Sequence, residues 1–521
     1  MGRINTNVPS LIAQRVLGQN NQELNLSLER LSTGLRINRG KDDPAGLIAS
    51  QNLRAEKGAI GAAISNAERA DQVVNIAEGG LQEISGLLNE LQGLITQTAN
   101  DGGISPEEKS ANQLQIDSIL QTIDRVAAAT SFQGLRLLNG NLDYVTEAVD
   151  ANVQSFKVNG AKLNYQETRD VDVVVTGSAQ VAGFYLSFGA ANLDLGAGTD
   201  RFVIEIAGSK GARELSFVSG TSIANIVNAI NSFTEVTGVR ATLSGSTGTT
   251  SGISLQSVGF GSSEFVTVQV VSDGAINTAF ANAGIYKLAA TDTNAASTAG
   301  ADRTLFSAAS NRITDYGQNV VATINGIQAT TNGTVARINT DFLDVEVNLK
   351  TGTASGTEAQ RVGSLSAFTI TGGGADFQLA GQVDITGKVS IGIANVAVRN
   401  IGQTVLADSN TYFLADLGGG RSLNVVDGNL NGAQEIVATA IADITQLRGR
   451  LGAFQRNNIG STIRSLSVSL ENTTAAESTI RDTNFSGETS QLTRSQVLQA
   501  ASTQVLSIAN SQPQSVLQLL G

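Results

Sequence analysis

The stretch that decides the fold runs from Ile60 to Thr98 and reads IGAAISNAERADQVVNIAEGGLQEISGLLNELQGLITQT. Read at alternating spacings of three and four residues, it gives a single row in which every member but the last is apolar: Ile60, Ala63, Ala67, Ala70, Val74, Ala77, Leu81, Ile84, Leu88, Leu91, Ile95 and Thr98. A random row of this length would hold roughly five apolar residues in a chain of this composition. The 3.5-residue repeat predicts a long helix whose narrow seam packs along another helix. An ordinary helical bundle would give the same row, so the row alone leaves that alternative open.

Composition sets limits on the class of protein. The 521 residues exceed the size at which one hydrophobic core suffices, so we expect two or more domains. The net charge of −12 argues against a nucleic-acid partner, which requires a basic patch. The chain has no His and no Cys, which removes most zinc, copper and haem ligand sets and the usual general base of hydrolases. Chemistry by carboxylates, Ser, Thr, Lys or Tyr remains open on composition alone. The family resemblance given below implies no enzymatic activity, no catalytic residue, no metal and no cofactor.

The sequence shows no recognisable targeting signal. No basic start followed by an apolar core indicates a signal peptide, and no long apolar run indicates a membrane span. These rules predict a soluble, cytoplasmic protein without membrane insertion. The resemblance described below replaces the cytoplasmic prediction.

Helical patterns fill the first 140 residues. After Pro9 a helix is predicted as far as Arg39, with its seam interrupted by Asn21 and formed by Leu17, Leu24, Leu28, Leu31 and Leu35. Asp43 and Pro44 predict the start of the next helix, which runs to about Asn100 with Gly58 or Gly61 as candidate interruptions. Ser105-Pro106-Glu107-Glu108 predicts a further helix that ends near Ala129. Residues 134–140 then predict a hairpin.

The middle and the end of the chain differ in character. From about 141 to 431, Gly, Ser, Thr, Ala and Val dominate, and alternating runs at 201–206 and 265–270 flank a helical pattern at 222–230. This order predicts one or two β-rich domains with short helices. Helix returns near Ala433, where the row ending at Phe454 and the row starting at Ile459 are out of phase, a shift typical of a stutter. The last helix carries Leu498, Ala501, Val505 and Ile508 and is predicted to be interrupted at Pro513.

These patterns predict an α+β multidomain protein. The N- and C-terminal helices pair into a coiled-coil-like rod, and a β-rich outer lobe is inserted in the middle of the chain. The predicted divisions are 1–43 and 483–521 for the terminal helices, 44–140 and 432–482 for the two halves of the rod, and 141–431 for the outer lobe, with one subdomain at about 177–290. Unpaired apolar stripes on such helices are typical of interfaces between subunits.

Several blocks of the sequence resemble the bacterial flagellins, the subunits of the flagellar filament. The N-terminal blocks are LSTGLRINRGKDDPAGLIAS at 31–50, RADQVVNIAEGGLQEI at 69–84 and FQGLRLLNG at 132–140. The C-terminal blocks are QLRGRLGAFQRN at 446–457, ENTTAAESTIRDTNF at 471–485 and the run at 492–520. The module at 201–272 resembles a small motif that recurs in flagellin and hook-protein insertions.

The resemblance implies a homopolymer that forms a hollow helical filament, the propeller of swimming bacteria. It implies export through the flagellar type III apparatus without a cleaved signal, an extracellular location, a cytosolic chaperone on the C-terminal helices, and contacts with the filament cap and hook-junction proteins. O-linked sugars on the outer domain are a further expectation, for example at Ser244–Ser251. The residues expected to form subunit interfaces are Leu24, Leu28, Leu31, Leu35, Leu81, Leu88, Leu91, Ile444, Leu447, Leu451, Leu498, Val505, Ile508, Leu517 and Leu520.

One stretch departs from the family pattern. Flagellins sensed by the vertebrate flagellin-sensing Toll-like receptor often read LQRIRELAVQ where this chain has Leu88–Gln97. Asn89, Glu90 and Gln92 therefore mark the receptor-region equivalent, and Glu90 and Gln92 stand where arginines would be. Since an acidic side chain reverses the charge of a guanidinium, we expect poor recognition by that receptor.

Alternatives stay open for function and for several charged residues. A hook-junction protein, or an adhesive filament protein whose outer domain binds surfaces or glycans, is the alternative function; a zinc protease is excluded because the chain has no His. Lys41-Asp42-Asp43 fits either an inter-subunit ion pair or a helix cap. Arg448 and Arg450, with Asp443, are candidates to bridge neighbouring helices, whereas Asp170, Asp172 and Asp200 fit solvated turns better than a calcium loop.

Overall fold

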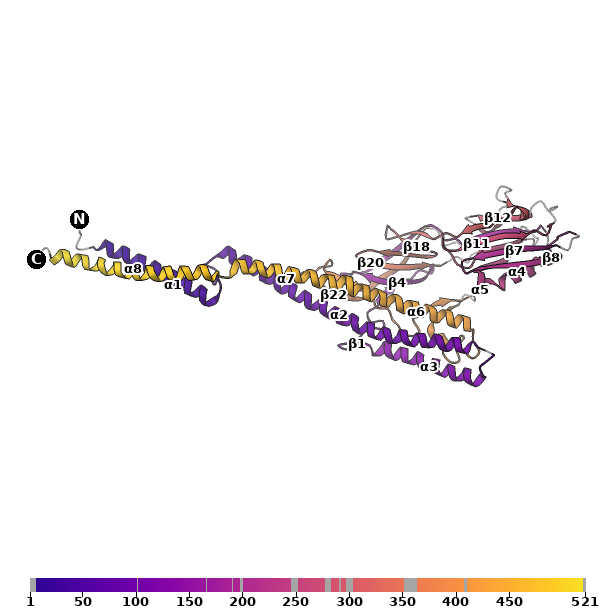
Figure 1. Ribbon diagram of the computed structural model, residues 1–521, viewed down its shortest axis with the longest axis horizontal. Coiled ribbons are helices and arrows are strands. Elements are labelled where there is room, and N and C mark those ends of the chain that lie inside the picture. The colour runs from indigo at the N-terminus through magenta and orange to yellow at the C-terminus, as the bar shows by residue number, and fades with distance from the viewer. Residues whose placement is uncertain are drawn as a thin grey trace. The chain divides into compact units, whose positions relative to one another are not determined.

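A computed structural model describes residues 6–100, 102–164, 166–189, 191–196, 200–244, 252–276, 283–289, 292–296, 303–350, 363–406 and 410–518. By its internal contacts the chain forms two compact units. The first comprises Met1–Gly79, Phe377–Val389 and Arg448–Gly521, and the second comprises Gly80–Asp376 and Ser390–Leu447. The fold is α+β, with helices at both ends of the chain and sheets in the middle (Figure 1).

Long helices occupy the two ends of the chain. The helices are α1 (Val8–Thr33), α2 (Pro44–Thr98), α3 (Pro106–Ala129), α6 (Leu430–Ala453), α7 (Gly460–Arg481) and α8 (Phe485–Gln518), with a π-helical segment η5 (Phe454–Ile459) between α6 and α7. In the first unit, α1 and α8 lie side by side and run antiparallel (Figure 1). The prediction that N- and C-terminal helices pair is confirmed.

The α2 seam is buried along its whole length. Every member of the row from Ile60 to Thr98 is at most 6% exposed, as the 3.5-residue repeat predicts. Neither Gly58 nor Gly61 interrupts the helix. A glycine in a helix interior costs about 1 kcal/mol relative to Ala, and the buried seam outweighs that cost.

Helix starts and stops follow local chemistry. Asp43 Oδ1 accepts a hydrogen bond from the Gly46 amide at 2.9 Å, which is the predicted cap of α2. Ser105 and Glu108 form a reciprocal capping box at the start of α3. The predicted end of the first helix at Arg39 is wrong, because Gly34 takes a left-handed conformation with φ +73° and closes α1 at Thr33.

The predicted stutter coincides with η5. A π-helical turn adds one residue relative to α-helical spacing, so two rows that are out of phase can both face inward. Phe454 is 6% exposed and Ile459 is 1% exposed, at the two ends of η5. Gln455 Nε2 donates to Asp71 Oδ1 at 2.8 Å, which ties this segment to α2 within the first unit.

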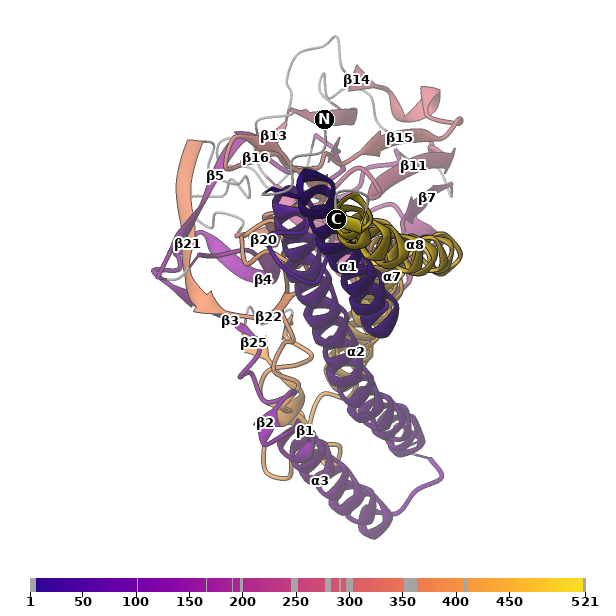
Figure 2. The ribbon, with the colours of Figure 1, turned by 90° about the vertical axis from the view of Figure 1, so that its left-hand side faces the viewer.

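In the second unit, α3 runs back alongside the end of α2 (Figure 2). The Asn112 amide donates to Thr98 Oγ1 at 2.9 Å between them. After α3, the short strands β1 (Ser131–Phe132) and β2 (Leu135–Arg136) form a hairpin that starts before the predicted range 134–140 and ends at Arg136. The segment around η4 (Leu414–Leu417) covers α3, where Gln113 Nε2 donates to the Leu417 carbonyl at 2.9 Å.

Two antiparallel sheets enclose one β-rich core. One sheet has the order β17-β16-β5-β21-β3 and the other β18-β19-β20-β4. Their strands are β3 (Tyr144–Glu147), β4 (Val153–Ala161), β5 (Arg169–Gly177), β16 (Val321–Ile324), β17 (Ile327–Gln328), β18 (Thr330–Asn332), β19 (Val335–Asn339), β20 (Leu343–Leu349) and β21 (Gly363–Gly373). Val173, Val347 and Phe368 meet in this core.

A second pair of sheets encloses a separate core. The orders are β13-β12-β6-β10-β9, with β14 beside β12, and β15-β11-β7-β8. The elements are β6 (Gly183–Ser187), β7 (Arg201–Gly208), β8 (Ala212–Val218), α4 (Ile223–Asn231), α5 (Thr234–Thr237), β9 (Val239–Ser244), β10 (Gly252–Ser257), β11 (Phe265–Ser272), β12 (Gly284–Ala289), β13 (Asp292–Ala296), β14 (Arg303–Thr304), η2 (Phe306–Ala308) and β15 (Ile313–Tyr316). The residues of this core extend from Ala182 to Ala309, beyond the expected end near 290.

The remaining strands form two short ribbons. They pair β22 (Ala375–Gln378) with β23 (Lys388–Ile391) and β24 (Thr404–Val405) with β25 (Thr411–Tyr412).

Candidate assembly surfaces

The seam between α1 and α8 is made of small and polar side chains. Buried residues on it are Ser10, Ala13, Asn20 and Ser27 from α1 and Ser495, Ser502 and Ala509 from α8. Leu17, Leu24 and Leu31 complete the α1 row and are half-buried.

Other large apolar side chains of the same helices point away from this seam. On α1 they form a face of Val8, Leu11, Ile12 and Val16, here called the α1 apolar face. On α8 they form a face of Val497, Leu498, Ala501, Val505 and Ile508, here called the α8 apolar face. Leu11 is 58% exposed and Ile508 is 57% exposed, so nothing in the described part of the chain covers these faces.

The predicted N-terminal interface residues fall into different environments. Leu24 and Leu31 lie on the half-buried row, whereas Leu28 lies outside it and is 46% exposed. Leu35 is not on α1; it forms a β-bridge with Asp482. The expected single leucine seam is therefore wrong, because the buried row runs one position away from Leu28 and α1 ends before Leu35.

The predicted rod residues are buried within the chain itself. Leu81, Leu88 and Leu91 are fully buried, and Ile444, Leu447 and Leu451 are each at most 4% exposed. In this structure they have no surface to offer to a second copy, and their role is intramolecular packing.

The predicted C-terminal residues are exposed as far as the structure describes them. Leu498, Val505 and Ile508 all belong to the α8 apolar face. Leu520 and the side chain of Leu517 lie outside the described residues. The predicted interruption at Pro513 is wrong, since α8 continues to Gln518. Pro513 has no N–H to donate to the carbonyl of Ala509, and the Asn7 Nδ2 donates to that carbonyl at 2.7 Å instead.

The two connectors next to these helices pair with each other. The Arg36 amide donates to the Arg481 carbonyl at 2.7 Å, and the Thr483 amide donates to the Gly34 carbonyl at 2.9 Å. Hydrogen bonds from the amides of Arg39 and Asn38 to Asp42 Oδ2 lower the pKa of the Asp42 carboxyl below its ordinary 3.8, the Arg39 bond having the larger effect. These bonds keep the turn before α2 closed.

Charged side chains join α1, α2, α7 and α8 in the first unit. Arg30 pairs with Glu488 at 3.6 Å, and the buried Glu477 of α7 lies 3.4 Å from both Arg54 and Lys57 of α2. Of the predicted bridging residues, Arg448 of α6 pairs with Glu78 of α2 at 2.7 Å, and Asp443 pairs with Lys157 of β4 at 2.6 Å.

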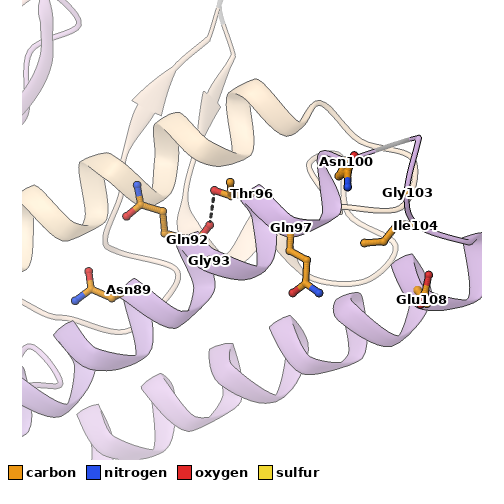
Figure 3. A pocket seen from close by; sticks show the side chains of 9 residues that line it. All are labelled: Asn89, Gln92, Gly93, Thr96, Gln97, Asn100, Gly103, Ile104 and Glu108. Carbon is orange, nitrogen blue, oxygen red and sulfur yellow. Dashed lines mark hydrogen bonds between the residues drawn. The ribbon is translucent and has the colours of Figure 1, made fainter.

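An open hollow of about 860 Å³ lies where α2 turns into α3 (Figure 3). Its lining is mostly amide and hydroxyl groups, and it consists of Asn89, Gln92, Gly93, Thr96, Gln97, Asn100, Gly103, Ile104 and Glu108. Thr96 Oγ1 donates to the Gln92 carbonyl at 2.9 Å. Asn89 and Gln92 of the receptor-region equivalent line this hollow, whereas the exposed Glu90 does not.

The other predicted acidic residues lie on or near the outer lobe's strands. Asp170 and Asp172 are exposed on β5 and are strand residues, not turn residues. Asp170 accepts a hydrogen bond from Thr369 Oγ1 at 2.6 Å. The expected glycan stretch from Ser244 to Ser251 lies almost entirely outside the described residues.

The described part of the chain offers neither a metal-binding cluster nor a membrane-spanning helix. Among those residues, no group of three or more acidic side chains is arranged to hold a metal ion. No described helix is both long and apolar enough to cross a membrane.

Comparisons with known proteins agree with this architecture. Residues 4–143 match the bacterial flagellin N-terminal helical region, residues 434–520 match the C-terminal helical region, and residues 201–259 match the flagellin hook IN motif. Flagellin B of Helicobacter pylori is 28% identical over 550 aligned residues, and a flagellin of Salmonella muenchen is 28% identical over 558, each alignment covering 99% of both chains. The solved structure of FliC from Burkholderia pseudomallei matches at 16% identity and a TM-score of 0.22, covering 74% of this chain and 99% of that one; a score this low adds nothing to the assignment.

The chain belongs to the bacterial flagellin family. It is a structural subunit of the flagellar filament, the extracellular polymer used for swimming. The resemblance drawn from the terminal sequence blocks is confirmed, and so is that of the 201–272 module.

Proposed function

We propose that copies of this chain assemble through the α1 and α8 apolar faces. The observation that carries the proposal is their exposure: Leu11, Val505 and Ile508 are each more than half exposed on helices whose inward seam is small and polar. Soluble chains rarely leave such contiguous apolar stripes in water, because burying them is favourable. In the filament, neighbouring copies would cover these stripes.

The predicted divisions of the chain follow from this proposal. Segments 1–43 and 483–521 form the inner tube of the filament, 44–140 and 432–482 form the rod around it, and 141–431 faces outward. Leu81, Leu88, Leu91, Ile444, Leu447 and Leu451 keep the rod rigid from inside, so that the exposed residues are presented in a fixed arrangement. The role is mechanical, and the absence of His from the sequence supports a protein without enzymatic activity.

The same apolar stripes need covering before assembly. A cytosolic chaperone on residues 483–520 would shield the α8 apolar face, and the flagellar export apparatus would pass the chain outward without a cleaved signal. The filament cap and hook-junction proteins are its partners at the two ends of the polymer. O-linked glycans, where present, belong on the outward segment 141–431.

The deciding experiment compares the full chain with a version lacking Gln491–Gly521, each seeded with short filament fragments. We expect the full chain to pellet as filaments visible by electron microscopy and the truncated chain to stay soluble. If both assemble equally well, the terminal helices are not the assembly surface.

A finer comparison uses substitutions on one helix. Val505→Ser with Ile508→Ser removes two apolar contacts, and since each 1.4 kcal/mol changes an equilibrium about tenfold, we expect the critical concentration to rise about tenfold or more. Thr503→Ser with Gln504→Ser, at exposed polar positions of the same helix, is the matched control and leaves assembly unchanged.

We also propose that the receptor-region equivalent is a poor ligand for the vertebrate flagellin-sensing receptor. Glu90 is exposed on α2 and Gln92 lines the polar hollow, so neither supplies a guanidinium. A receptor reporter cell assay should give a weak response to the purified chain, and Glu90→Arg with Gln92→Arg should raise it. A strong response to the unmodified chain contradicts the proposal.

A further inference from the structure

We infer that polar side chains on the α1–α8 seam, chiefly Asn7 and Asn20, set the register of these two helices and so fix how their apolar faces are presented. This inference rests on the proposed function, because register matters only if the faces are assembly surfaces. It adds a positioning role for residues that make no apolar contact themselves.

Asn7 joins the two helices at one end of the seam. Its Oδ1 accepts from the Ser10 amide at 3.1 Å and caps α1, while its Nδ2 donates to the Ala509 carbonyl at 2.7 Å. That carbonyl is available because Pro513, four residues later, has no N–H to donate to it. A proline that would normally weaken a helix therefore creates an acceptor at one position of α8.

Asn20 joins the helices nearer the middle. Its Nδ2 donates to Ser502 Oγ at 2.7 Å and lies 3.3 Å from the Leu498 carbonyl, and the side chains of Asn20 and Ser502 are both 8% exposed. Beside it, Gln499 Nε2 donates to Asn21 Oδ1 at 2.9 Å. Buried polar groups of this kind cost free energy when they lose their partners.

The small residues alone do not define the register. Ser495, Ser502 and Ala509 are buried and spaced seven apart, so α8 presents a similar small surface after a slide of one heptad. After such a slide Asn20 would face Ser495 or Ala509, and Asn7 would no longer reach the carbonyl freed by Pro513. A single buried Asn is known to select register in coiled coils in the same way.

Register decides which apolar side chains lie next to each other on the paired helices. In the observed register Ser10 Oγ donates to Asn510 Oδ1 at 2.7 Å, which places Leu11 and Ile12 of the α1 apolar face beside the turn of α8 that carries Ile508. A slide of seven residues moves α8 along α1 by about 10 Å, at 1.5 Å per residue. The composite apolar surface would then no longer match that of a neighbouring copy.

The test uses disulfide cross-links between introduced cysteines. Because the chain has no Cys of its own, no native thiol can form a competing disulfide. Ser10→Cys with Asn510→Cys reports the observed register. Ser10→Cys with Thr503→Cys and Leu17→Cys with Asn510→Cys report slides of one heptad in either direction. Full-length chains are assembled on seeds and oxidised, and a non-reducing gel separates cross-links within a chain from those between chains.

Two variants remove the register contacts without removing the helices. Asn7→Asp keeps the cap oxygen but loses the donor to the Ala509 carbonyl. Asn20→Leu replaces the buried amide with the residue type found at the neighbouring row positions 17 and 24. Ser495→Ala is the matched control, because the Ser495 hydroxyl is buried without a hydrogen-bond partner among the described residues.

For Asn7→Asp with Asn20→Leu we expect the in-register cross-link to fall about fivefold to tenfold and the slid cross-links to appear, while helical content by circular dichroism is kept. Ser495→Ala should change nothing. Exchanging the pair, Asn20→Ser with Ser502→Asn, should restore the observed register. If the double variant keeps the wild-type cross-link pattern, or if Ser495→Ala changes it equally, the inference is wrong.

If the double variant does not assemble, Ser502→Ala takes its place, because it removes only the hydroxyl that accepts from Asn20. The cross-link pattern should then change in the same direction but by a smaller factor. Failure of the proposed function is distinguishable, since it would appear as assembly that does not depend on Gln491–Gly521, whatever the cross-link pattern. Failure of the register inference requires wild-type filaments and an unchanged register in the variants.

Discussion

At the scale of single residues, burial separates leucines that look alike in the sequence. Leu88 of the α2 seam is fully buried, whereas Leu114 of α3 is 70% exposed. The 3.5-residue row contains Leu88, and the α3 row, which includes Ile116 and Ile119, does not contain Leu114. The pattern therefore predicts which leucines support the fold.

Leu88→Ala should lower the free energy of unfolding by about 2–5 kcal/mol, because it removes buried methyl groups and leaves a cavity. Guanidinium unfolding followed by helical circular dichroism measures the change. Leu114→Ala is the matched control and should stay within about 0.5 kcal/mol of the wild type. Equal losses for both variants would mean that the seam is not the core of this helical part.

Asp42 should make the connector before α2 sensitive to acid. Because its folded pKa lies below 3.8, the carboxylate's contribution is present above pH 3.8 and is lost as the pH falls through the lower folded pKa. The difference in unfolding midpoint between wild type and Asp42→Ala should be constant well above pH 3.8 and should shrink progressively as the pH falls below that value. A difference that persists at the lowest pH contradicts this account.

At the scale of elements, the phase of a row depends on how the helix is wound. The rows ending at Phe454 and starting at Ile459 could be read as a stutter from the sequence, but the π-helical turn that reconciles them is a tertiary feature. It persists because both Phe454 and Ile459 are buried, and Gln455 bonds Asp71 and Asn75 of α2. An uninterrupted α-helix would turn one of the two rows outward.

Deleting Asn458 from η5 should convert the π-helical turn into α-helix. Phe454 and Ile459 would then stand four residues apart, about 40° from each other around an α-helix, so both stay buried and the free energy of unfolding should change by less than about 1 kcal/mol. Chemical unfolding measures this change, and electron microscopy of assembled filaments shows whether the helical form changes. Deleting Ser465 from α7, which has no extra residue to lose, is the control: it rotates the residues after it by about 100° and should cost more. If both deletions cost the same, the extra residue of η5 does not set the phase of the two rows.

At the scale of the whole molecule, the β-rich core from Ala182 to Ala309 connects to the rest of the second unit where residues 180 and 318 meet. Gln180 and Gln318 exchange backbone hydrogen bonds of 2.9 and 3.0 Å, so the chain enters and leaves this part at one point. Its core residues run from Ala182 to Ala309, whereas those of the neighbouring core lie outside that range. Phe260 is the partly buried residue that packs against the neighbouring core.

Replacing residues 181–317 by Asn-Gly should therefore give a chain that folds and assembles. Two residues of this type close an antiparallel pair such as Gln180 and Gln318. Loss of Phe260 should lower the stability of the remaining sandwich by no more than about 3 kcal/mol. Seeded assembly and thermal unfolding test this prediction. A shortened chain that unfolds or no longer assembles would show that the rest of the chain needs the Ala182–Ala309 core in order to fold or assemble.

The sequence by itself determined the helices, the α2 seam, the caps at Asp43 and Ser105, and membership of the flagellin family. Periodicity and capping are local chemistry, so they can be read without a fold. The tertiary structure alone decided which face of α1 and α8 turns inward. The leucine row appeared to be the whole seam, but Leu17, Leu24 and Leu31 are only half-buried. The hydrogen bonds across the seam are made by Ser10, Asn20 and Ser502, residue types that are also common on surfaces. Hydrophobic periodicity identifies residues that share a face and gives no information on whether the same chain or another copy covers it. The acceptor left by Pro513 likewise gains its meaning only from Asn7, about five hundred residues away in the sequence.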